Sequence, residues 1–240
     1  RAGAGGSSRD SVWVRIYNDK NELIRTTRWR ADSGFNRSYW GMEEKGFRQP
    51  GFPKPRPGAP EPGGLQVLPG TYKVVITLGR ESDSTFITIK DDPRIGNRDE
   101  AKKAQRKLYQ RLRSSTDKLT EAMDRLTEAS EVLTKINGQL QNLEGKEIDS
   151  LRKTTKAMQD SIKVIREFIS GKTSDRQGIT RSSDPTVMTR MQEANQYIGS
   201  KLIGPGPQEE GLVGNAEKLI GEALQRTNHF FEGKWKDYRK

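Results

Sequence analysis

The sequence predicts an α+β protein of two domains: a small antiparallel β-sandwich of immunoglobulin or fibronectin type III-like form, followed by an antiparallel four-helix bundle. Three observations predict it. Short runs of alternating apolar and polar residues fill residues 11–95, as in strands with one buried face. Residues 97–240 instead show the period of amphipathic helices. The 240 residues are enough for two domains that each have a core.

Residues 1–10 are small and rich in glycine, which predicts a flexible linker. The first expected strand follows it, because Val12, Val14 and Ile16 alternate with more polar neighbours. A turn and a second strand at 22–30 complete a hairpin. We expect a third short strand at 34–40, introduced by a glycine.

Residues 44–66 are rich in proline and glycine and predict an extended surface loop, since proline removes backbone donors from a sheet. The clearest strand of the chain follows at 71–78, where Tyr72, Val74 and Ile76 share one face. Residues 84–90 are expected to pair back on it. Several short strands joined by turns are typical of a small sandwich.

The helical domain is expected to begin at residue 97, with Asn97 as a helix cap. Asp184 before a proline is the expected start of the third helix. A membrane-lying or dimerising helix is the alternative to a bundle, but apolar stripes on all four helices let them bury one another. The helices are expected at about 98–137, 146–170, 185–203 and 211–237. Leucines spaced by seven mark the first of them: Leu112, Leu119, Leu126, Leu133 and Leu140.

The net charge of +11 raises the question of nucleic acid. Basic residues are interleaved with acids along the whole chain, which favours a solvated basic surface and no nucleic-acid partner. No apolar run approaches the roughly 18 residues that a membrane span needs. The linker-like start predicts a piece cut from a longer protein.

No catalytic, cofactor-binding or metal-binding residues are predicted. The chain has no cysteine and a single histidine, His229, which excludes the usual ligand sets of zinc and haem. We expect His229 to be a partly buried structural residue. A Gly-x-Ser-x-Gly nucleophile motif is also missing. Paired carboxylates for glycoside hydrolysis would need a cleft, which a helical bundle does not obviously offer.

Several motifs in order suggest a family. The chain resembles the immunoglobulin-like domain of flagellar hook-capping proteins. More closely, it resembles the C-terminal region of exported bacterial sortilin-like β-propeller proteins, which are often labelled glycosyl hydrolases with BNR repeats. The motif positions are Gly34, Asn36 and Trp40; Pro69, Gly70, Thr71 and Tyr72; Asp92, Pro93 and Arg94; and, near the end, Asn228, Phe230, Phe231, Trp235, Tyr238 and Arg239.

The resemblance implies a non-catalytic accessory or structural module of a larger exported protein, located in the periplasm, at the cell surface or outside the cell. Its partner would be the upstream β-propeller of the same polypeptide, which the module would pack on or orient. The alternative is an independent carbohydrate- or protein-binding module, with Trp13 and Trp29 as candidate surface-binding residues. Hydrolase activity within this chain is the least favoured hypothesis. No cofactor is expected.

Overall fold

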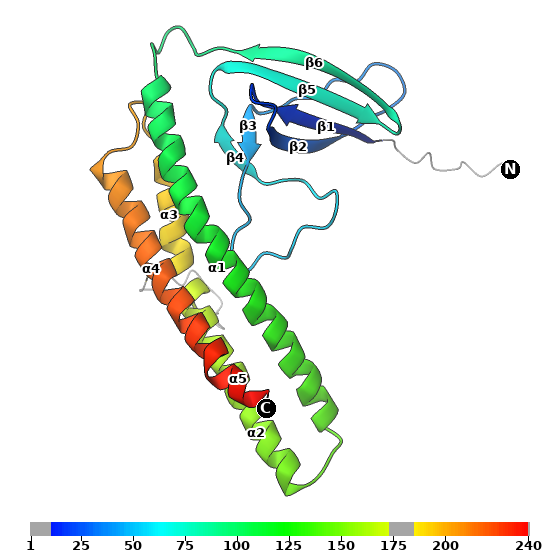
Figure 1. Cartoon of the computed structure of the whole chain (residues 1–240), viewed down its shortest axis with the longest axis vertical. Helices are drawn as coiled ribbons and strands as arrows, with labels where there is room; N and C mark the ends of the chain where they lie inside the picture. The colour runs from blue at the N-terminus through cyan, green and yellow to red at the C-terminus, as the bar shows by residue number, and fades with distance from the viewer. Residues whose placement is uncertain (1–10, 173–184, 240) are drawn as a thin grey trace, which may run out of the picture. The chain divides into compact units, whose positions relative to one another are not determined.

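The computed structural model describes residues 11–172 and 185–239 and shows an α+β protein with a small antiparallel sheet and a set of helices (Figure 1). It divides into two compact units, which are described one at a time. The β-unit comprises the described parts of Arg1–Phe47 and Pro53–Lys102, and the helical unit comprises Arg48–Phe52 and the described parts of Lys103–Lys240. The predicted linker at 1–10 and Asp184, the expected start of the third helix, lie outside the described residues.

The β-unit is built on a four-stranded antiparallel sheet with the order β2-β1-β5-β6. Its strands are β1 (Ser11–Tyr17), β2 (Leu23–Arg30), β5 (Gly70–Leu78) and β6 (Glu81–Ile89). One hairpin turn joins β1 to β2, and another joins β5 to β6. Asn21 in the first turn and Gly79 in the second have positive φ. A separate two-stranded ribbon pairs β3 (Glu43–Lys45) with β4 (Gly63–Gln66).

One face of the four-stranded sheet forms the core of the β-unit. Val14 and Ile16 of β1 are fully buried beside Val74 and Tyr72 of β5. Trp40 and Val67, from the segments flanking the ribbon, pack against this cluster. The Trp40 ring meets the Tyr72 ring edge to face at 5.8 Å, and its indole N–H donates to the Glu43 carbonyl. The predicted inward alternation is confirmed for Val14, Ile16, Tyr72 and Val74. Ile76, on the same face of β5, is 40% exposed.

The predicted third strand at 34–40 is wrong. Asn36 closes a turn there: its amide donates to the Asp32 and Gly34 carbonyls, and its side-chain oxygen accepts from the Asp32 N–H. Gly34 takes a positive φ of 97° within this turn. Asparagine competes with sheet hydrogen bonds in this way because its short side chain reaches neighbouring backbone groups. Of this segment, only Trp40 reaches the core.

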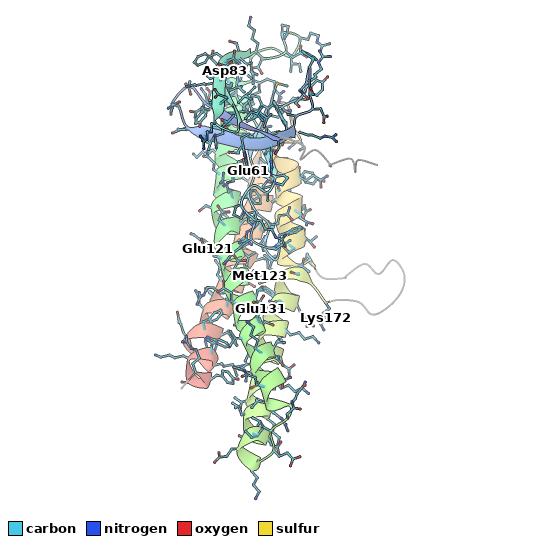
Figure 2. All side chains as sticks on the ribbon, turned by 90° about the vertical axis from the view of Figure 1, so that its right-hand side faces the viewer. Glu61, Asp83, Glu121, Met123, Glu131 and Lys172 are labelled. Atoms are coloured by element: carbon cyan, nitrogen blue, oxygen red, sulfur yellow. The ribbon has the colours of Figure 1, made fainter. Side chains whose placement is uncertain are left out.

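The Pro-rich segment is a loop in its middle but not at its ends, where β3 and β4 pair. Glycines allow the backbones of the two ribbon segments to approach closely, since a Cβ added at Gly46 would lie 2.1 Å from the Gly63 carbonyl oxygen. The loop also covers the edge of β2. Glu61, labelled in Figure 2, accepts the Thr26 N–H at 2.7 Å, and Arg25 donates to the Pro62 carbonyl. The Thr26 edge donor is thereby satisfied.

The helical unit contains, within its described part, four helices of twelve residues or more and one short helix. They are α1 (Asp99–Leu140), α2 (Lys146–Ser170), α3 (Val187–Ile198), α4 (Pro207–Glu232) and α5 (Lys234–Tyr238). The long helices α1 and α2 run in opposite directions, and α4 lies along them (Figure 1).

The leucine stripe of α1 is buried along its whole length, as predicted. Its middle part meets α2 residues such as Ile162 and Ile169 and α4 residues such as Ile220 and Phe230 in one apolar cluster. Met123, labelled on α1 in Figure 2, belongs to the same cluster. The buried threonines of these helices donate to the carbonyl one turn earlier, as Thr227 does to Ala223. Their hydroxyls are therefore compatible with an apolar core.

Several helix ends differ from the expected ones. α1 continues through Gly138 to Leu140, where the Arg152 guanidinium donates to the Leu140 and Leu143 carbonyls. α3 ends at Ile198, so that Leu202, which the expected helix 185–203 would include, lies beyond it and is 58% exposed. α4 begins earlier than expected, at Pro207. Its start is fixed by the buried Glu209, which accepts the Gly206 N–H and forms an ion pair with Lys201.

Five residues of the Pro-rich loop, Arg48–Phe52, belong to the helical unit by their contacts. The Arg48 guanidinium binds the Asp124 carboxylate of α1 through both terminal nitrogens. Thr120 of α1 donates to the Arg48 carbonyl at 3.2 Å. The hydrogen bond to Asp124 raises the pKa of Arg48 above its usual value. This segment is therefore clasped onto α1 by charge-assisted hydrogen bonds.

Candidate functional site

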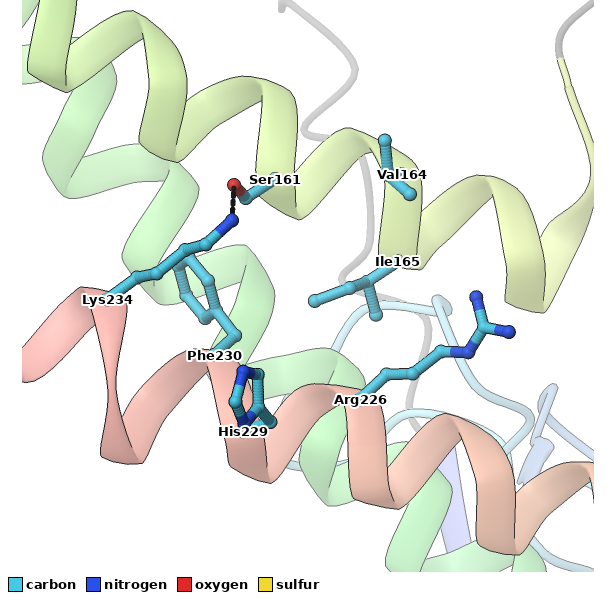
Figure 3. Close-up of a pocket in the computed structure, with 7 residues that line it drawn as sticks. All are labelled: Ser161, Val164, Ile165, Arg226, His229, Phe230 and Lys234. Atoms are coloured by element: carbon cyan, nitrogen blue, oxygen red, sulfur yellow. Dashed lines mark hydrogen bonds between the residues drawn. The ribbon is translucent and has the colours of Figure 1, made fainter.

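A pocket of about 260 Å³ lies between α2 and α4 and is a candidate site (Figure 3). Ile165 and Phe230 form its floor, because they face the core of the helical unit. The residues one position earlier, Val164 and His229, are turned toward solvent by the helical rotation of about 100° per residue. The remaining lining residues are Ser161 of α2, Arg226 of α4 and Lys234 of α5.

The rim of this pocket carries cationic or protonatable side chains. Lys234 reaches across from the first position of α5, and its ammonium donates to the Ser161 hydroxyl at 3.2 Å (Figure 3). The Arg226 guanidinium lies over the Phe168 ring, 3.9 Å from the centroid. Within residues 11–172 and 185–239, neither the Arg226 side chain nor the His229 side chain has a hydrogen bond or an ion pair. Their donors are open to a ligand.

The Ser161–Lys234 pair superficially resembles a nucleophile beside a base. The Ser161 hydroxyl, however, donates to the Ala157 carbonyl at 2.9 Å, while Lys234 donates to Ser161. Lys234 is also exposed, so it lacks the desolvation that makes a lysine a general base. The Ser161 hydroxyl thus donates to the backbone and accepts from Lys234, and this arrangement does not place the lysine to remove the Ser161 proton.

A second, more open groove of about 680 Å³ lies along α1 and the C-terminal segment. Phe231, Trp235 and Tyr238 form an aromatic series along it, with ring centroids 6.1 and 6.0 Å apart. The Tyr238 hydroxyl hydrogen-bonds the Thr155 hydroxyl at 2.8 Å, and the Arg125 guanidinium lies 4.2 Å from the Phe231 centroid. These contacts fasten α5 to the rest of the helical unit. The C-terminal aromatic motif therefore has a packing role.

Trp13 and Trp29, the two predicted surface-binding residues, lie on opposite faces of the four-stranded sheet. Trp29 pairs with Val12 and packs against the core of the β-unit. Trp13 pairs with Arg28, whose guanidinium is 5.5 Å from the Trp13 ring centroid, and its ring edge approaches Gly58. Both are partly buried. The two rings do not form one binding platform.

Sequence reasoning missed most of the pocket and was wrong about His229, which is exposed and not partly buried. α4 directs Thr227 and Phe230 inward, and this rotation turns Arg226 and His229 outward. Their spacing of three residues was a usable signal for one shared face. Lys234 gave no such signal, because its position depends on the break at Gly233 between α4 and α5.

In the part of the chain that the structure describes, no cluster of three or more His, Cys, Asp or Glu side chains could hold a metal ion. None of the helices described there combines the length and the apolar run needed to cross a bilayer. No protein-family model matches the chain, and no curated protein and no solved structure matches it significantly.

Proposed function

We propose that the chain is a non-catalytic accessory module of an exported bacterial protein of the sortilin-like β-propeller class, and that it packs on or orients the propeller. One observation supports this more than any other: the residues that carry the resemblance are engaged in holding the chain's own fold. Trp40 and Tyr72 contact each other in the core of the β-unit. At the motif Asp92-Pro93-Arg94, Arg94 donates to the Asp92 carboxylate from its backbone N–H and from its guanidinium. These bonds close a turn after the last strand.

The same proposal includes an immunoglobulin-like sandwich for the β-unit. The Tyr72 hydroxyl donates to the Leu68 carbonyl at 2.6 Å, four residues upstream. This resembles the tyrosine corner of immunoglobulin-type sandwiches, in which a tyrosine near the start of a strand bonds back across the connection between the two sheets. Here, too, the connection leads from the β3–β4 ribbon to β5 of the four-stranded sheet.

For the helical unit we propose an antiparallel four-helix bundle. Its supporting observation is the single apolar cluster to which α1, α2, α3 and α4 all contribute, including Leu126, Ile162, Val187 and Ile220. Heptad-spaced leucines on α1 are typical of bundle packing. The bundle would then be a rigid body presented to the partner propeller.

The reading frame that encodes the chain provides the first test, since the proposal requires a β-propeller in the same polypeptide. The second test compares the complete protein with a version lacking these 240 residues. We expect the propeller of the shortened protein to unfold at a lower temperature or to be exported less, because it loses a partner that stabilises only the folded state. A frame without a propeller, or a shortened protein of unchanged stability and export, would contradict the proposal.

A second candidate function is carbohydrate binding by the β-unit. The sheet face opposite the core carries Trp13, and Phe86, 67% exposed, lies on the same face. Aromatic rings on a flat surface can stack on sugar rings. A glycan titration distinguishes this function. Saturable binding that Trp13→Ala abolishes and Trp29→Ala leaves intact would favour it, whereas equal loss in both variants would indicate damage to the fold. Hydrolase turnover by the purified chain would instead revive the third hypothesis.

A further inference from the structure

We infer that the pocket between α2 and α4 is a binding site for a small carboxylate ligand with an apolar body. This inference concerns a different surface from the proposed function and does not depend on it. Its first support is charge. Among the described residues, the lining contains Arg226, Lys234 and His229, and none of the seven described lining residues is acidic. A concave site lined by one sign of charge attracts ligands of the opposite sign.

Two other hollows in the described part of the helical unit lack this charge pattern. The aromatic groove has Glu128 among its lining residues, and a third hollow near the α1–α2 connection has Asp160. The arginine of that third hollow, Arg152, already donates to the carbonyls at the end of α1. Both carry an internal acid that competes with an anionic ligand. The α2–α4 pocket does not.

The cationic groups are also held in place before a ligand arrives. The Ser161 hydroxyl accepts a hydrogen bond from the Lys234 ammonium, and the Phe168 ring supports the flat face of the Arg226 guanidinium. A supported guanidinium presents two parallel N–H groups, which match the two oxygens of a carboxylate. Because less side-chain freedom is lost on binding, preorganised donors give a higher affinity than free ones.

The floor of the pocket defines the rest of the ligand. Ile165 and Phe230 form an apolar surface, and Val164 beside them is 59% exposed. Burial of this surface stabilises a complex by about 25 cal/mol per Å² of apolar area removed from water. The volume of about 260 Å³ is close to the lower limit for ligand pockets. The site therefore suits one or two fused rings and not a polymer chain.

Naphthylacetate and its uncharged isostere naphthylacetamide provide a matched pair of probes for NMR titration of the whole chain. We expect naphthylacetate to give saturable shifts in the amides of residues 161–165 and 226–234, with a Kd of about 0.1 to 1 mM. The amide probe has the same apolar body but cannot pair with a guanidinium, so it should bind at least about tenfold more weakly. Arg226→Gln and Lys234→Gln should each weaken naphthylacetate binding by about fivefold or more.

Two control variants remove one charge each at other places on the same unit. Arg125→Gln removes the guanidinium that lies over Phe231 in the aromatic groove, and Lys163→Gln removes an exposed ammonium of α2 outside the pocket. Both should bind naphthylacetate like the unaltered chain. Val164→Glu provides an independent variant at an exposed position, where the new carboxylate should repel the probe without disturbing the fold.

Three results would overturn the inference. The first is the absence of saturable shifts up to about 10 mM probe. The second is equal binding of naphthylacetate and naphthylacetamide, which would leave no role for charge. The third is binding that shifts residues 231–239 and is lost in Arg125→Gln, which would place the ligand in the aromatic groove.

Discussion

The two units of this chain reach a folded state by different means. Among its described residues, the β-unit has a small core of five buried apolar side chains: Val14, Ile16, Val67, Tyr72 and Val74. It depends on close backbone approach at glycines and on turns closed by side chains. In the helical unit each of the helices α1 to α4 buries one face, and large side chains such as Leu119, Leu126 and Leu133 form a continuous buried stripe on α1. The stability of the β-unit should therefore be sensitive mainly to backbone and turn substitutions, and the stability of the helical unit mainly to side-chain truncation.

The largest effect is expected for Leu126→Ala in the helical unit. Leu126 is fully buried in the apolar cluster, so truncation removes its burial and leaves a cavity. This should lower the free energy of unfolding by about 3 to 5 kcal/mol. Native-state hydrogen exchange can measure it for each unit separately. Val132→Ala on the same helix, at a position 45% exposed, should cost far less. An equal loss of protection in both units would show that they unfold together and would break the comparison.

Gly46→Ala should have the next largest effect, this time in the β-unit. The new Cβ would lie 2.1 Å from the Gly63 carbonyl oxygen, so the β3–β4 ribbon must separate. We expect a loss of about 2 to 3 kcal/mol in denaturant unfolding followed by Trp fluorescence. Gly41→Ala is the matched control, because its Cβ meets only the end of the flexible Glu43 side chain. Equal stability of the two variants would disprove the importance of backbone approach here.

Tyr72→Phe tests the corner hydrogen bond while keeping the aromatic ring. The Leu68 carbonyl loses its donor, and the expected cost is about 1 kcal/mol in the same unfolding experiment. The ring contact between Trp40 and Tyr72 should survive, so the Trp fluorescence of the folded state should change little. Unchanged stability of Tyr72→Phe would show that this hydrogen bond adds nothing beyond the bonds to water that its two groups make in the unfolded chain.

The smallest effect is expected for Glu209→Gln and should depend on pH. The ion pair with Lys201 and then the Gly206 N–H hold the pKa of Glu209 below its usual value. A carboxylate with a lowered folded-state pKa stabilises the fold above its unfolded pKa and loses that contribution as the pH falls through the folded value. Urea midpoints measured from neutral to acid pH should therefore fall less steeply in Glu209→Gln than in the unaltered chain. Parallel curves would contradict this linkage.

The helical unit was more predictable from sequence than the β-unit, for a physical reason. A stripe such as Leu119, Leu126 and Leu133 is a direct record of burial, because each residue must face the core. The turn at Asn36 is not recorded in that way, since its hydrogen bonds compete with a strand in the same residues. The ribbon β3–β4 escaped prediction because its two strands are short and bracket a Pro-rich loop.

The candidate site was largely unpredictable for a different reason. Ser161 and Lys234 are 73 residues apart and meet only because α2 and the α4–α5 break bring them together. Single residues of this kind carry no periodic signal. The placement of Trp13 and Trp29 on opposite sheet faces depends likewise on register: Trp29 pairs with Val12 and Trp13 with Arg28.

The clasp of Arg48–Phe52 on α1 makes the helical unit discontinuous in sequence. Its hydrogen bonds join residues up to 76 positions apart, so closing them costs more chain entropy than any contact within the helix. No single cut can then release the helical unit intact. A fragment beginning near residue 97 would contain every helix yet leave Asp124 without its arginine. Protein engineers who divide this chain should retain both pieces or replace Asp124 with a residue that needs no partner.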